Sequence, residues 1–563
     1  MYIEDINKLL NKIILSLGYE DVSVSISLSN RPELCDYQCN DVFKIAKNSG
    51  SNPIEVGEKI VKGINEYSGI ENYFSSVEFC KPGFINLTLS NCFINKYLYL
   101  FNNDIKSTVK LEKECNVVLD YGGPNVAKPL HVGHMRTAIV GESIKRILNF
   151  FNTNVISDVH LGDIGLQIGQ VIYKIVEDNL SVDNININYL NDVYPKMSAL
   201  CKENEEVKEK CALITKKLQE KDPLYVDYWK KICEVSVMDI KKNYDFLDVS
   251  FDYWYGESDS YDDLEETKEV FSSVIEESQG AKIINVSNEE DKLELPPLLF
   301  QKSNGAYLYA SSDLATIVQR KRDFNPDKIL YVTDLRQSLH FKQVFRAADK
   351  VNLFSINNLE HLAYGTVNGE DNKPYKTRSG DTPKLETLFD DAKNIFISKK
   401  EENKYLSEDD LNIIVNSILK FADLQNSRDK DYIFDLSKFS EVNGKTGPYI
   451  LYTYLRIKKM LSEYTVTCDF SDNIYNVYDR NLRLKLLEIG KSLTLAFDER
   501  KPSYVADYVY NLCSVANNFY QNNYLNKLDS EQELNDYIFV LTLTNKYVNL
   551  LLDLLVIKLP TKM

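Results

Sequence analysis

The sequence predicts a multidomain protein whose central part is a parallel α/β domain. Its 563 residues are enough for three or four domains that each bury a core. At 117–119 an apolar, β-branched run leads through a glycine turn into a helical pattern, which is typical of a strand-turn-helix unit. From about Ser407 onward, apolar residues recur at helical spacing. We expect an α+β domain over 1–110, an α/β domain over 111–400 and an all-α domain over 401–563.

The first domain contains both strand and helix patterns. Residues 22–26 and 84–89 alternate polar and apolar side chains, as half-buried strands do. Between them, Asn52, Pro53 and Glu55 form the pattern of a capping residue, a proline in the first helical position and an acid three after the cap. This pattern predicts a helix that begins at Pro53.

The central domain holds two strand-to-helix junctions. The first follows 117–119. The second follows a strand predicted over 154–159, where Gly162 and Gly165 open a helix beside His160. In a parallel sheet the carboxyl ends of the strands lie beside helix N-termini, whose free N–H groups attract phosphates. We therefore expect a ligand site at these junctions.

Two insertions interrupt the central domain. The first, at about 170–250, is amphipathic and helical and predicts a scaffold without chemistry. The second, 257–303, precedes a strand expected at 306–309. Its part 257–294 has thirteen acids against three basic residues, which favours a solvated surface module.

The composition argues against several classes of protein. A net charge of −17 disfavours a general polyanion binder, although 441–563 has fourteen charges of each sign and leaves an RNA partner open. No stretch approaches about 18 apolar residues and no signal peptide is visible, so we expect a cytoplasmic protein without a membrane segment. Ten cysteines without a CxxC pair suggest neither a disulfide framework nor a structural metal.

His131 and His134 lie at the first junction. At i and i+3 of a first helical turn both imidazoles can face one side, and Gly133 lets a base or phosphate approach the backbone. Such a pair can donate to a phosphate that gains charge in a transition state. The alternative is that both histidines only cap the helix. All five histidines lie between 131 and 361, which favours a functional cluster.

The stretch PNVAKPLHVGH (124–134) resembles the HIGH signature of class I aminoacyl-tRNA synthetases, in the form found in arginyl-tRNA synthetases. Further stretches are similar to that family from one end of the chain to the other. They are DYQCN (36–40), KPGFINLTLS (81–90), HLGDIGLQIG (160–169), YLYASSDLATIVQR (307–320), ILYVTDLRQSLH (329–340), KPYKTRSGDTPKL (373–385) and GKTGPYILYTYLR (444–456).

The resemblance implies a Rossmann-like class I synthetase catalytic core, an N-terminal appended domain that contacts tRNA and a C-terminal helical domain that binds the anticodon. It implies ATP-dependent ligation of arginine to tRNA(Arg) through an arginyl-adenylate, with release of AMP and pyrophosphate. ATP is then a substrate that carries Mg²⁺, no structural metal is bound, and a monomer is expected. The family also implies that tRNA must bind before activation.

The resemblance assigns ATP binding and catalysis to the HxGH residues and to a basic loop. Such a loop can swing over a polyphosphate and neutralise charge on the departing pyrophosphate. The loop at 373–380 stands at the family's KMSK position but has Arg378-Ser379 where Ser-Lys would stand, and in many arginyl enzymes a lysine before the HxGH motif is thought to substitute. The expected residues are His131, Gly133, His134, Lys376, Arg378 and Lys128, and which cation serves is left open.

For arginine the resemblance implies a second set of residues. A guanidinium offers five donors in a rigid fork and no acceptor, so it needs a carboxylate with hydrogen-bonding company. Asp313 with Tyr309 supplies this, and Asp120 adds a second acid. Asn125 and Gln337 match positions at the amino end of the substrate. From the residues alone, Asp313 can equally be a helix cap.

For tRNA the resemblance points to two regions. A loop at 36–40 would offer Tyr37, Gln38 and Asn40 for stacking on and hydrogen bonding to unpaired bases. In the last domain, Tyr452 and Arg456 at i and i+4 would share a helix face. Tyrosines are common here, with 37 in the chain, so packing is the alternative for each of them.

Two other functions remain open at this point. One is a nucleotidyltransferase of the same HxGH superfamily that acts on another small acid, which would not need the C-terminal helical domain. The other is a non-catalytic tRNA-binding paralogue, against which the retained His131, His134, Asp313 and Gln337 argue.

Overall fold

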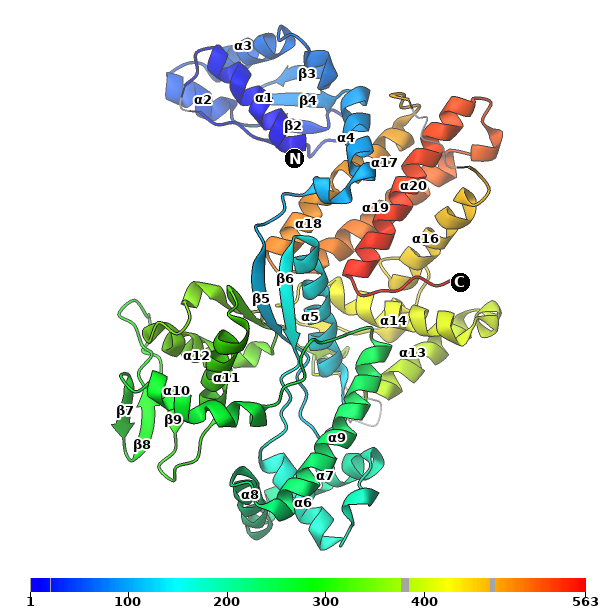
Figure 1. Cartoon of the computed structure of the whole chain (residues 1–563). Helices are drawn as coiled ribbons and strands as arrows, with labels where there is room; N and C mark the ends of the chain where they lie inside the picture. The colour runs from blue at the N-terminus through cyan, green and yellow to red at the C-terminus, as the bar shows by residue number, and fades with distance from the viewer. Residues whose placement is uncertain (1, 21, 376–383, 466–470) are drawn as a thin grey trace. The chain divides into compact units, whose positions relative to one another are not determined.

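The computed structural model describes residues 2–20, 22–375, 384–465 and 471–563 (Figure 1). The chain divides into two compact units. Unit 1 contains Met1–Leu111, Thr453–Thr494 and Tyr508–Leu550. Unit 2 contains Glu112–Tyr452, Leu495–Asp507 and Leu551–Met563. The last predicted domain, 401–563, is divided between the two units. The boundaries of the three predicted domains are therefore not tested by this division and stay a prediction.

An antiparallel sheet with the order β1-β2-β4-β3 forms the N-terminal part of unit 1. Its strands are β1 (Ile26–Leu28), β2 (Tyr37–Cys39), β3 (Phe74–Cys80) and β4 (Phe84–Leu89), and the helices around it are α1 (Tyr2–Ser16), α2 (Val42–Ser49), α3 (Pro53–Asn65) and α4 (Asn91–Asn103). Helix α3 confirms the capping pattern, since the Asn52 side chain accepts the N–H of Ile54. The strand predicted at 22–26 is wrong in position, because the N–H of Val24 donates to the Asn11 side chain of α1 instead.

Helical segments from the C-terminal third complete unit 1. They are α17 (Val477–Leu487) and parts of α16 (Gly447–Leu461), α18 (Ile489–Asp498), α19 (Ser503–Asn522) and α20 (Glu531–Leu554). Arg480 of α17 donates to the Asp36 carboxylate at 2.6 Å, and the fully buried Arg483 donates to Asn95 of α4, also at 2.6 Å. These charge-assisted bonds join the N-terminal sheet region to helices almost 400 residues away in the sequence.

A parallel sheet with the order β11-β10-β5-β6 lies at the centre of unit 2. Its strands are β5 (Cys115–Asp120), β6 (Thr153–Asp158), β10 (Lys328–Tyr331) and β11 (Leu359–His361), which confirms the strands predicted around 117–119 and 154–159. The register places Asp120 opposite both Asp158 and Tyr331. The carboxyl ends of β5, β6 and β10 therefore meet at one edge of the sheet.

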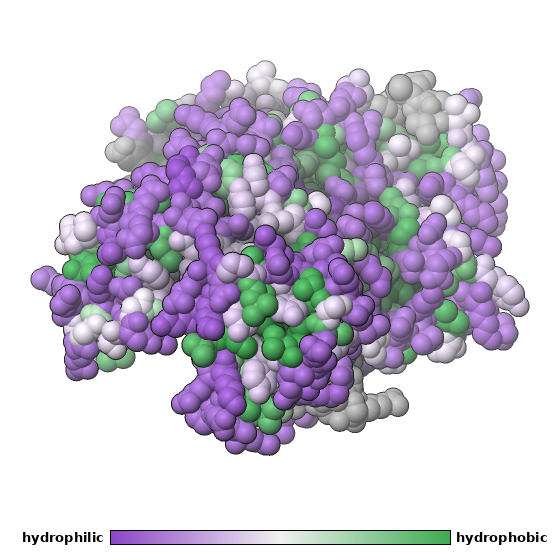
Figure 2. All heavy atoms as spheres, turned by 60° about the horizontal axis from the view of Figure 1, so that its bottom comes forward, coloured by the Kyte–Doolittle hydropathy of each residue, from purple (hydrophilic) through white to green (hydrophobic). Residues whose placement is uncertain are grey.

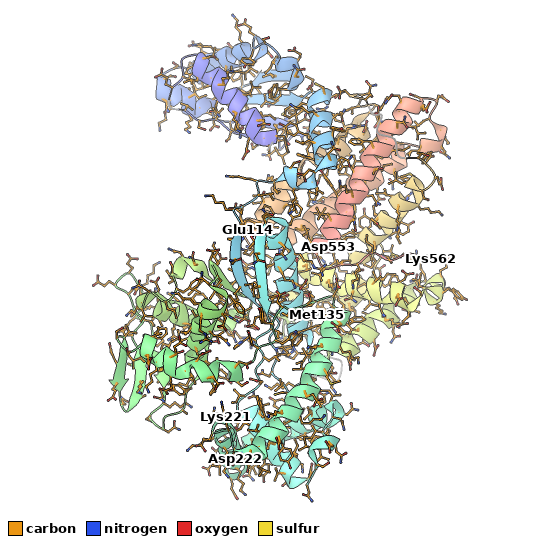
Figure 3. The ribbon with its side chains drawn as sticks, in the orientation of Figure 1. Glu114, Met135, Lys221, Asp222, Asp553 and Lys562 are labelled. Atoms are coloured by element: carbon orange, nitrogen blue, oxygen red, sulfur yellow. The ribbon has the colours of Figure 1, made fainter. Side chains whose placement is uncertain are left out.

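The helices of unit 2 follow and surround this sheet. They are α5 (Val132–Phe150), α6 (Leu166–Glu177), α7 (Ile187–Glu203), α8 (Glu205–Gln219), α9 (Pro223–Phe246), α10 (Leu264–Val270), α11 (Tyr309–Phe324), α12 (Ser338–Lys350), α13 (Leu385–Lys399), α14 (Glu408–Leu424) and α15 (Leu436–Phe439). Helix α5 is buried along most of its length. Near the end of α5, Arg146 donates to the Asp553 carboxylate at 2.9 Å, so this hydrogen bond connects residues 551–563 to α5. Asp553 is labelled in Figure 3.

The acidic insertion has a small sheet of its own. Strands β7 (Ile275–Ser278), β8 (Ala281–Ile284) and β9 (Leu298–Gln301) form it with antiparallel pairing. The strand expected at 306–309 is wrong: Tyr309 is the first residue of α11, and only Tyr307 makes an isolated bridge to Gln301. Two further short strands, β12 (Val367–Asn368) and β13 (Tyr432–Ile433), pair in parallel elsewhere in unit 2.

The surface over α6–α9 is mixed in character. Figure 2 shows hydrophobic residues among a largely hydrophilic surface. The exposed apolar residues on these helices include Leu166, Val176, Leu200, Leu213, Leu224 and Met238. Within the described ranges, none of the helices has the length and apolar character needed to cross a bilayer.

Candidate active site

The two signature histidines form the N-terminal cap of α5. His131 is the N-cap residue, and its Nδ1 accepts the N–H of Gly133 at 3.1 Å. His134 reaches back, and its Nδ1 accepts the N–H of His131 at 3.1 Å. The two rings lie with centroids 3.9 Å apart. The capping interpretation of the HxxH pattern is therefore realised in the structure.

Capping also sets the chemistry of both rings. A ring nitrogen that accepts an N–H carries no proton, so a neutral imidazole in this arrangement is protonated on Nε2. Burial and the nearby charges of His131 and Lys128 lower the pKa of His134 to about 3, and burial with Lys128 also lowers the pKa of His131. Both rings are thus neutral Nε2–H donors near neutral pH, beside the positive end of a helix dipole.

A cavity of about 940 Å³ opens at the carboxyl ends of β5 and β10. His131, Gly133 and His134 line it. The five residues predicted to hold arginine line it as well: Asp120, Asn125, Tyr309, Asp313 and Gln337. The fold therefore brings three of the predicted ATP-binding residues and all five predicted arginine-binding residues into one cavity, from segments about 200 positions apart.

Hydrogen bonds join the first two strand-to-helix junctions beneath this cavity. The N–H of Val126 donates to the Gly162 carbonyl at 3.0 Å, and the N–H of Gly162 donates to the Pro124 carbonyl at 3.1 Å. A Cβ on Gly162 would lie only 2.2 Å from Oδ1 of Asn125. Glycine at this position therefore lets the Asn125 side chain occupy its place in the cavity wall.

Acidic groups gather in one part of the cavity wall. Asp313 is the fifth residue of α11, and its Oδ2 is 2.5 Å from Nε2 of His340 on α12. Glu257 lines the same cavity. Burial, followed by the charges of Asp313 and Asp163, raises the pKa of Glu257 to about 8. Tyr309 stands beside this acid pair with 61% of its surface exposed. A cation that entered here would relieve the repulsion between Glu257 and Asp313.

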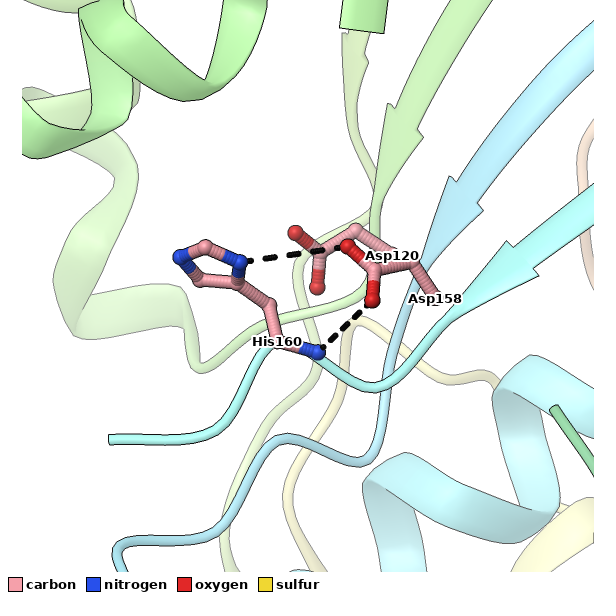
Figure 4. Close-up of side chains that lie close together, drawn as sticks. All are labelled: Asp120, Asp158 and His160. Carbon is pink, nitrogen blue, oxygen red and sulfur yellow. Dashed lines mark hydrogen bonds and ion pairs between the residues drawn. The ribbon is translucent and has the colours of Figure 1, made fainter. Parts of the chain in front are cut away.

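Asp120 lies in the cavity wall but is already paired with an internal guanidinium. Nη2 of Arg320, which is 1% exposed, lies 2.6 Å from Oδ2 of Asp120 and 2.7 Å from Oδ2 of Asp158. His160 completes this cluster, with its Nδ1 3.8 Å from Asp158 Oδ2 and its N–H donating to Asp158 Oδ1 (Figure 4). Among the described acids that line the cavity, Asp120 therefore has an arginine partner, whereas Asp313 and Glu257 have none.

The Asp120 cluster does not suit a metal ion in this arrangement. Asp120, Asp158 and His160 each offer one ligand atom within 4.8 Å of the others. However, the Arg320 guanidinium already bonds both carboxylates and supplies the positive charge that a cation would bring.

Three basic residues, Lys128, Lys376 and Arg378, are predicted to take part in catalysis, and the structure describes the side chain of Lys128. The Lys128 ammonium lies 4.9 Å from the centre of the Tyr194 ring, outside the set of residues that line the cavity. Lys376 and Arg378 lie outside the described residues. The segment that follows them contacts the residues just before the HxGH motif, since the N–H of Leu385 donates to the Leu130 carbonyl at 2.9 Å.

The first group of predicted tRNA-contacting residues, at 36–40 in unit 1, includes a strand. The loop expected at 36–40 is wrong, because Tyr37–Cys39 form β2 and pair with both neighbouring strands. Tyr37 is 1% exposed and bonds Tyr2, so its ring is part of the core. Gln38 donates to Asn86, and Asn40 is exposed.

The other two predicted tRNA contacts lie on α16. Tyr452 is 45% exposed. The Arg456 guanidinium lies 3.7 Å from the centre of the Tyr520 ring, which is close enough for a cation–π interaction. Neither observation tests a contact with tRNA, so both assignments stay predictions.

Glu257 is the site residue that the sequence interpretation missed. The segment around it runs beside the second junction, because the N–H of Leu161 donates to the Tyr255 carbonyl and the N–H of Glu257 donates to the Leu161 carbonyl. The signal was the aromatic run at 251–255, whose β propensity extends the sheet edge before the acidic segment begins. The acidic composition of 257–294 instead favours a surface position for Glu257.

Family models match most of the chain. The model described as tRNA synthetases class I (R), catalytic domain matches residues 98–436. An arginyl tRNA synthetase N terminal domain matches 2–89, and a DALR anticodon binding domain matches 450–563. The chain therefore contains the catalytic domain of a class I aminoacyl-tRNA synthetase with its N-terminal and helical C-terminal domains.

Full-length relatives narrow this class. The arginine-tRNA ligase of Agathobacter rectalis is 37% identical over 599 aligned positions, with 99% of each chain covered, and that of Francisella tularensis is 36% identical over 588, also with 99% of each chain covered. The solved arginyl-tRNA synthetase of Plasmodium falciparum has a TM-score of 0.79 at 26% identity and covers 100% of this chain and 99% of its own. The chain belongs to the arginyl-tRNA synthetase family.

Proposed function

We propose that this chain ligates arginine to tRNA(Arg) by way of an arginyl-adenylate formed from ATP. The observation that carries the proposal is a single cavity with two unlike linings. One lining contains two neutral imidazole donors at a helix N-terminus, which suits phosphate, and the other contains Asp313 and Glu257, which suit a cation. ATP and arginine together match these linings.

At the phosphate lining, the chain supplies donors for developing charge. The carboxylate of arginine attacks the α-phosphorus of ATP in line, and pyrophosphate leaves. The Nε2–H groups of His131 and His134 donate to phosphate oxygens that gain charge in the transition state. Lys128, Lys376 and Arg378 are proposed to neutralise the departing pyrophosphate, and Mg²⁺ enters as part of the ATP substrate.

At the acid lining, Asp313 and Glu257 receive the guanidinium. Two carboxylates can accept several of its five N–H donors, and Tyr309 adds a hydroxyl at the rim. Asn125 and Gln337 line the cavity where they can bind the amino end of the substrate. Asp120 is not proposed to bind the guanidinium directly, because its carboxylate already binds Arg320 in the cavity wall.

The remaining predictions concern partners and setting. We propose that Gln38, Asn40, Tyr452 and Arg456 contact tRNA(Arg), that tRNA binding precedes activation, and that the protein is a cytoplasmic monomer. The buried Tyr37 is no longer among the proposed contacts, because its ring offers no surface to a base.

The test is charging of a tRNA(Arg) transcript with labelled arginine and ATP. We expect acid-precipitable, alkali-labile arginyl-tRNA, and none when tRNA(Lys) replaces tRNA(Arg). Absence of charging, together with pyrophosphate exchange driven by another small acid without tRNA, would support the HxGH nucleotidyltransferase alternative. Tight tRNA binding with neither reaction would support the non-catalytic paralogue.

A further inference from the structure

His340 forms a hydrogen bond with Asp313 in the acid lining of the cavity. Its Nε2 lies 2.5 Å from Oδ2 of Asp313, and both side chains line the cavity. His340 is on the first turn of α12, and Asp313 is the fifth residue of α11. The contact therefore connects the N-terminal parts of two helices at the proposed guanidinium partner, and it uses only one of the two carboxylate oxygens.

The second carboxylate oxygen of Asp313, Oδ1, can accept hydrogen bonds from a ligand with both of its lone pairs. Oδ1 has no hydrogen-bond partner in the parts of the chain that the structure describes. The χ2 torsion of an aspartate is broad, so an aspartate held only by its backbone can rotate its carboxylate plane. A guanidinium binds both oxygens in one plane, so rotation of that plane weakens the pair. A hydrogen bond from His340 removes this freedom and leaves a second lone pair on Oδ2.

The electrostatic setting is consistent with this arrangement. Burial lowers the pKa of His340, but the hydrogen bond and charge of Asp313 outweigh burial and raise it overall. Other groups near the pair are Glu257, Tyr331 and His361, of which His361 bonds Thr333 at 2.8 Å. The Asp313 carboxylate therefore favours the protonated form of the His340 ring.

We propose that His340 is a positioning residue that orients the Asp313 carboxylate for bidentate recognition of a guanidinium, and so sets the preference for arginine over lysine. This inference rests on the proposed function. Lysine brings a compact charge with three rotatable donors, so its binding depends less on the plane of the carboxylate. Loss of the His340 hydrogen bond should therefore weaken arginine binding more than lysine binding.

The test compares three variants in tRNA(Arg)-dependent pyrophosphate exchange. His340→Ala removes the donor, His340→Gln retains an N–H donor at a similar reach, and Gln343→Ala is the control on the same helix, where Gln343 donates to the Pro296 carbonyl. We expect His340→Ala to raise the arginine KM about tenfold, with kcat and the ATP KM within about twofold, because an Asp313 carboxylate that is free to rotate binds the guanidinium less well and takes no part in the chemical step. His340→Gln should stay within about threefold of wild type, and Gln343→Ala within about twofold.

A double-mutant cycle separates positioning from a general structural role. On an Asp313→Asn background, His340→Ala should add less than about twofold to the arginine KM, because its partner carboxylate is already gone. An equal effect on both backgrounds, or a His340→Ala variant that matches Gln343→Ala, overturns the inference. If His340→Ala does not fold, His340→Leu fills the same space without a donor and replaces it. Wild-type enzyme without arginine dependence would instead refute the proposed function.

Discussion

Glu257 should make arginine binding depend on pH. Burial and then the charges of Asp313 and Asp163 raise its pKa to about 8, so the empty site holds it mostly protonated at pH 7. A bound guanidinium favours the ionised carboxylate, because an opposite charge lowers a carboxyl pKa. Arginine should therefore bind in exchange for the Glu257 proton.

The size of the effect follows from this pKa. A group with a pKa of about 8 is about 90% protonated at pH 7 and about 99% at pH 6, so arginine affinity should fall nearly tenfold, or about 1.4 kcal/mol, per pH unit below 8. Affinity rises with pH and levels off above about 8. The groups that face Glu257 are Asp313, Asp163, Tyr309 and Tyr261. The Asp313 carboxylate raises the pKa of His340 on the neighbouring α12 through its hydrogen bond and charge.

Titration calorimetry with arginine at pH 6, 7 and 8 measures this exchange. Repeating the titration at pH 7 in buffers of different ionisation enthalpy should show release of about 0.9 proton per arginine from Glu257, the fraction protonated in the empty site. Glu257→Gln should bind arginine weakly with little dependence on pH. Equal wild-type affinities at pH 6 and pH 8, or an unchanged slope in Glu257→Gln, would refute the reasoning.

Four further predictions concern the same proposed reaction. His134→Ala should lower the rate of adenylate formation by about 10² or more with tRNA affinity nearly unchanged, and a single-turnover rate within threefold of wild type would remove His134 from the transition state. If Lys128 substitutes for a loop lysine, Lys128→Ala should slow single-turnover activation more than Lys376→Ala, and the reverse order returns the role to the loop. Asp313→Asn should weaken arginine at least about tenfold without changing the ATP KM, and should weaken neutral citrulline less, whereas equal arginine dependence in exchange assays would exclude it from the site. Gly162→Ala should displace Asn125 and raise the arginine KM, since its Cβ would lie 2.2 Å from the Asn125 amide oxygen, and an unchanged KM would show that Asn125 does not bind substrate.

Local patterns predicted the elements that carry the phosphate lining. The run at 117–119 and the capping residues before α3 and α5 are signals within a few positions, and the structure confirms β5, α3 and α5. The same patterns could not show how the histidine rings are protonated. That depends on two backbone N–H groups aimed at Nδ1, which only the folded helix start displays.

Long-range contacts account for what the sequence did not show. Arg320 reaches Asp120 across 200 positions, so an acid that sequence alone offers to the substrate is already paired. Glu257 enters the cavity because its segment bonds Leu161, although its neighbours in sequence are surface acids. The β2 strand buries Tyr37 by pairing with β4, which the short DYQCN stretch did not reveal. In each case the deciding partner lies in another element.

The central claim is that this cavity activates arginine, and pyrophosphate exchange with tRNA(Arg) present tests it most directly. Wild-type protein would be assayed with arginine, lysine and citrulline at equal concentrations, with and without tRNA. The account predicts exchange with arginine alone, at least about tenfold above the other two, because only arginine offers both the charge and the planar fork to Asp313 and Glu257. Exchange with lysine or citrulline equal to that with arginine, or none with arginine, would contradict it.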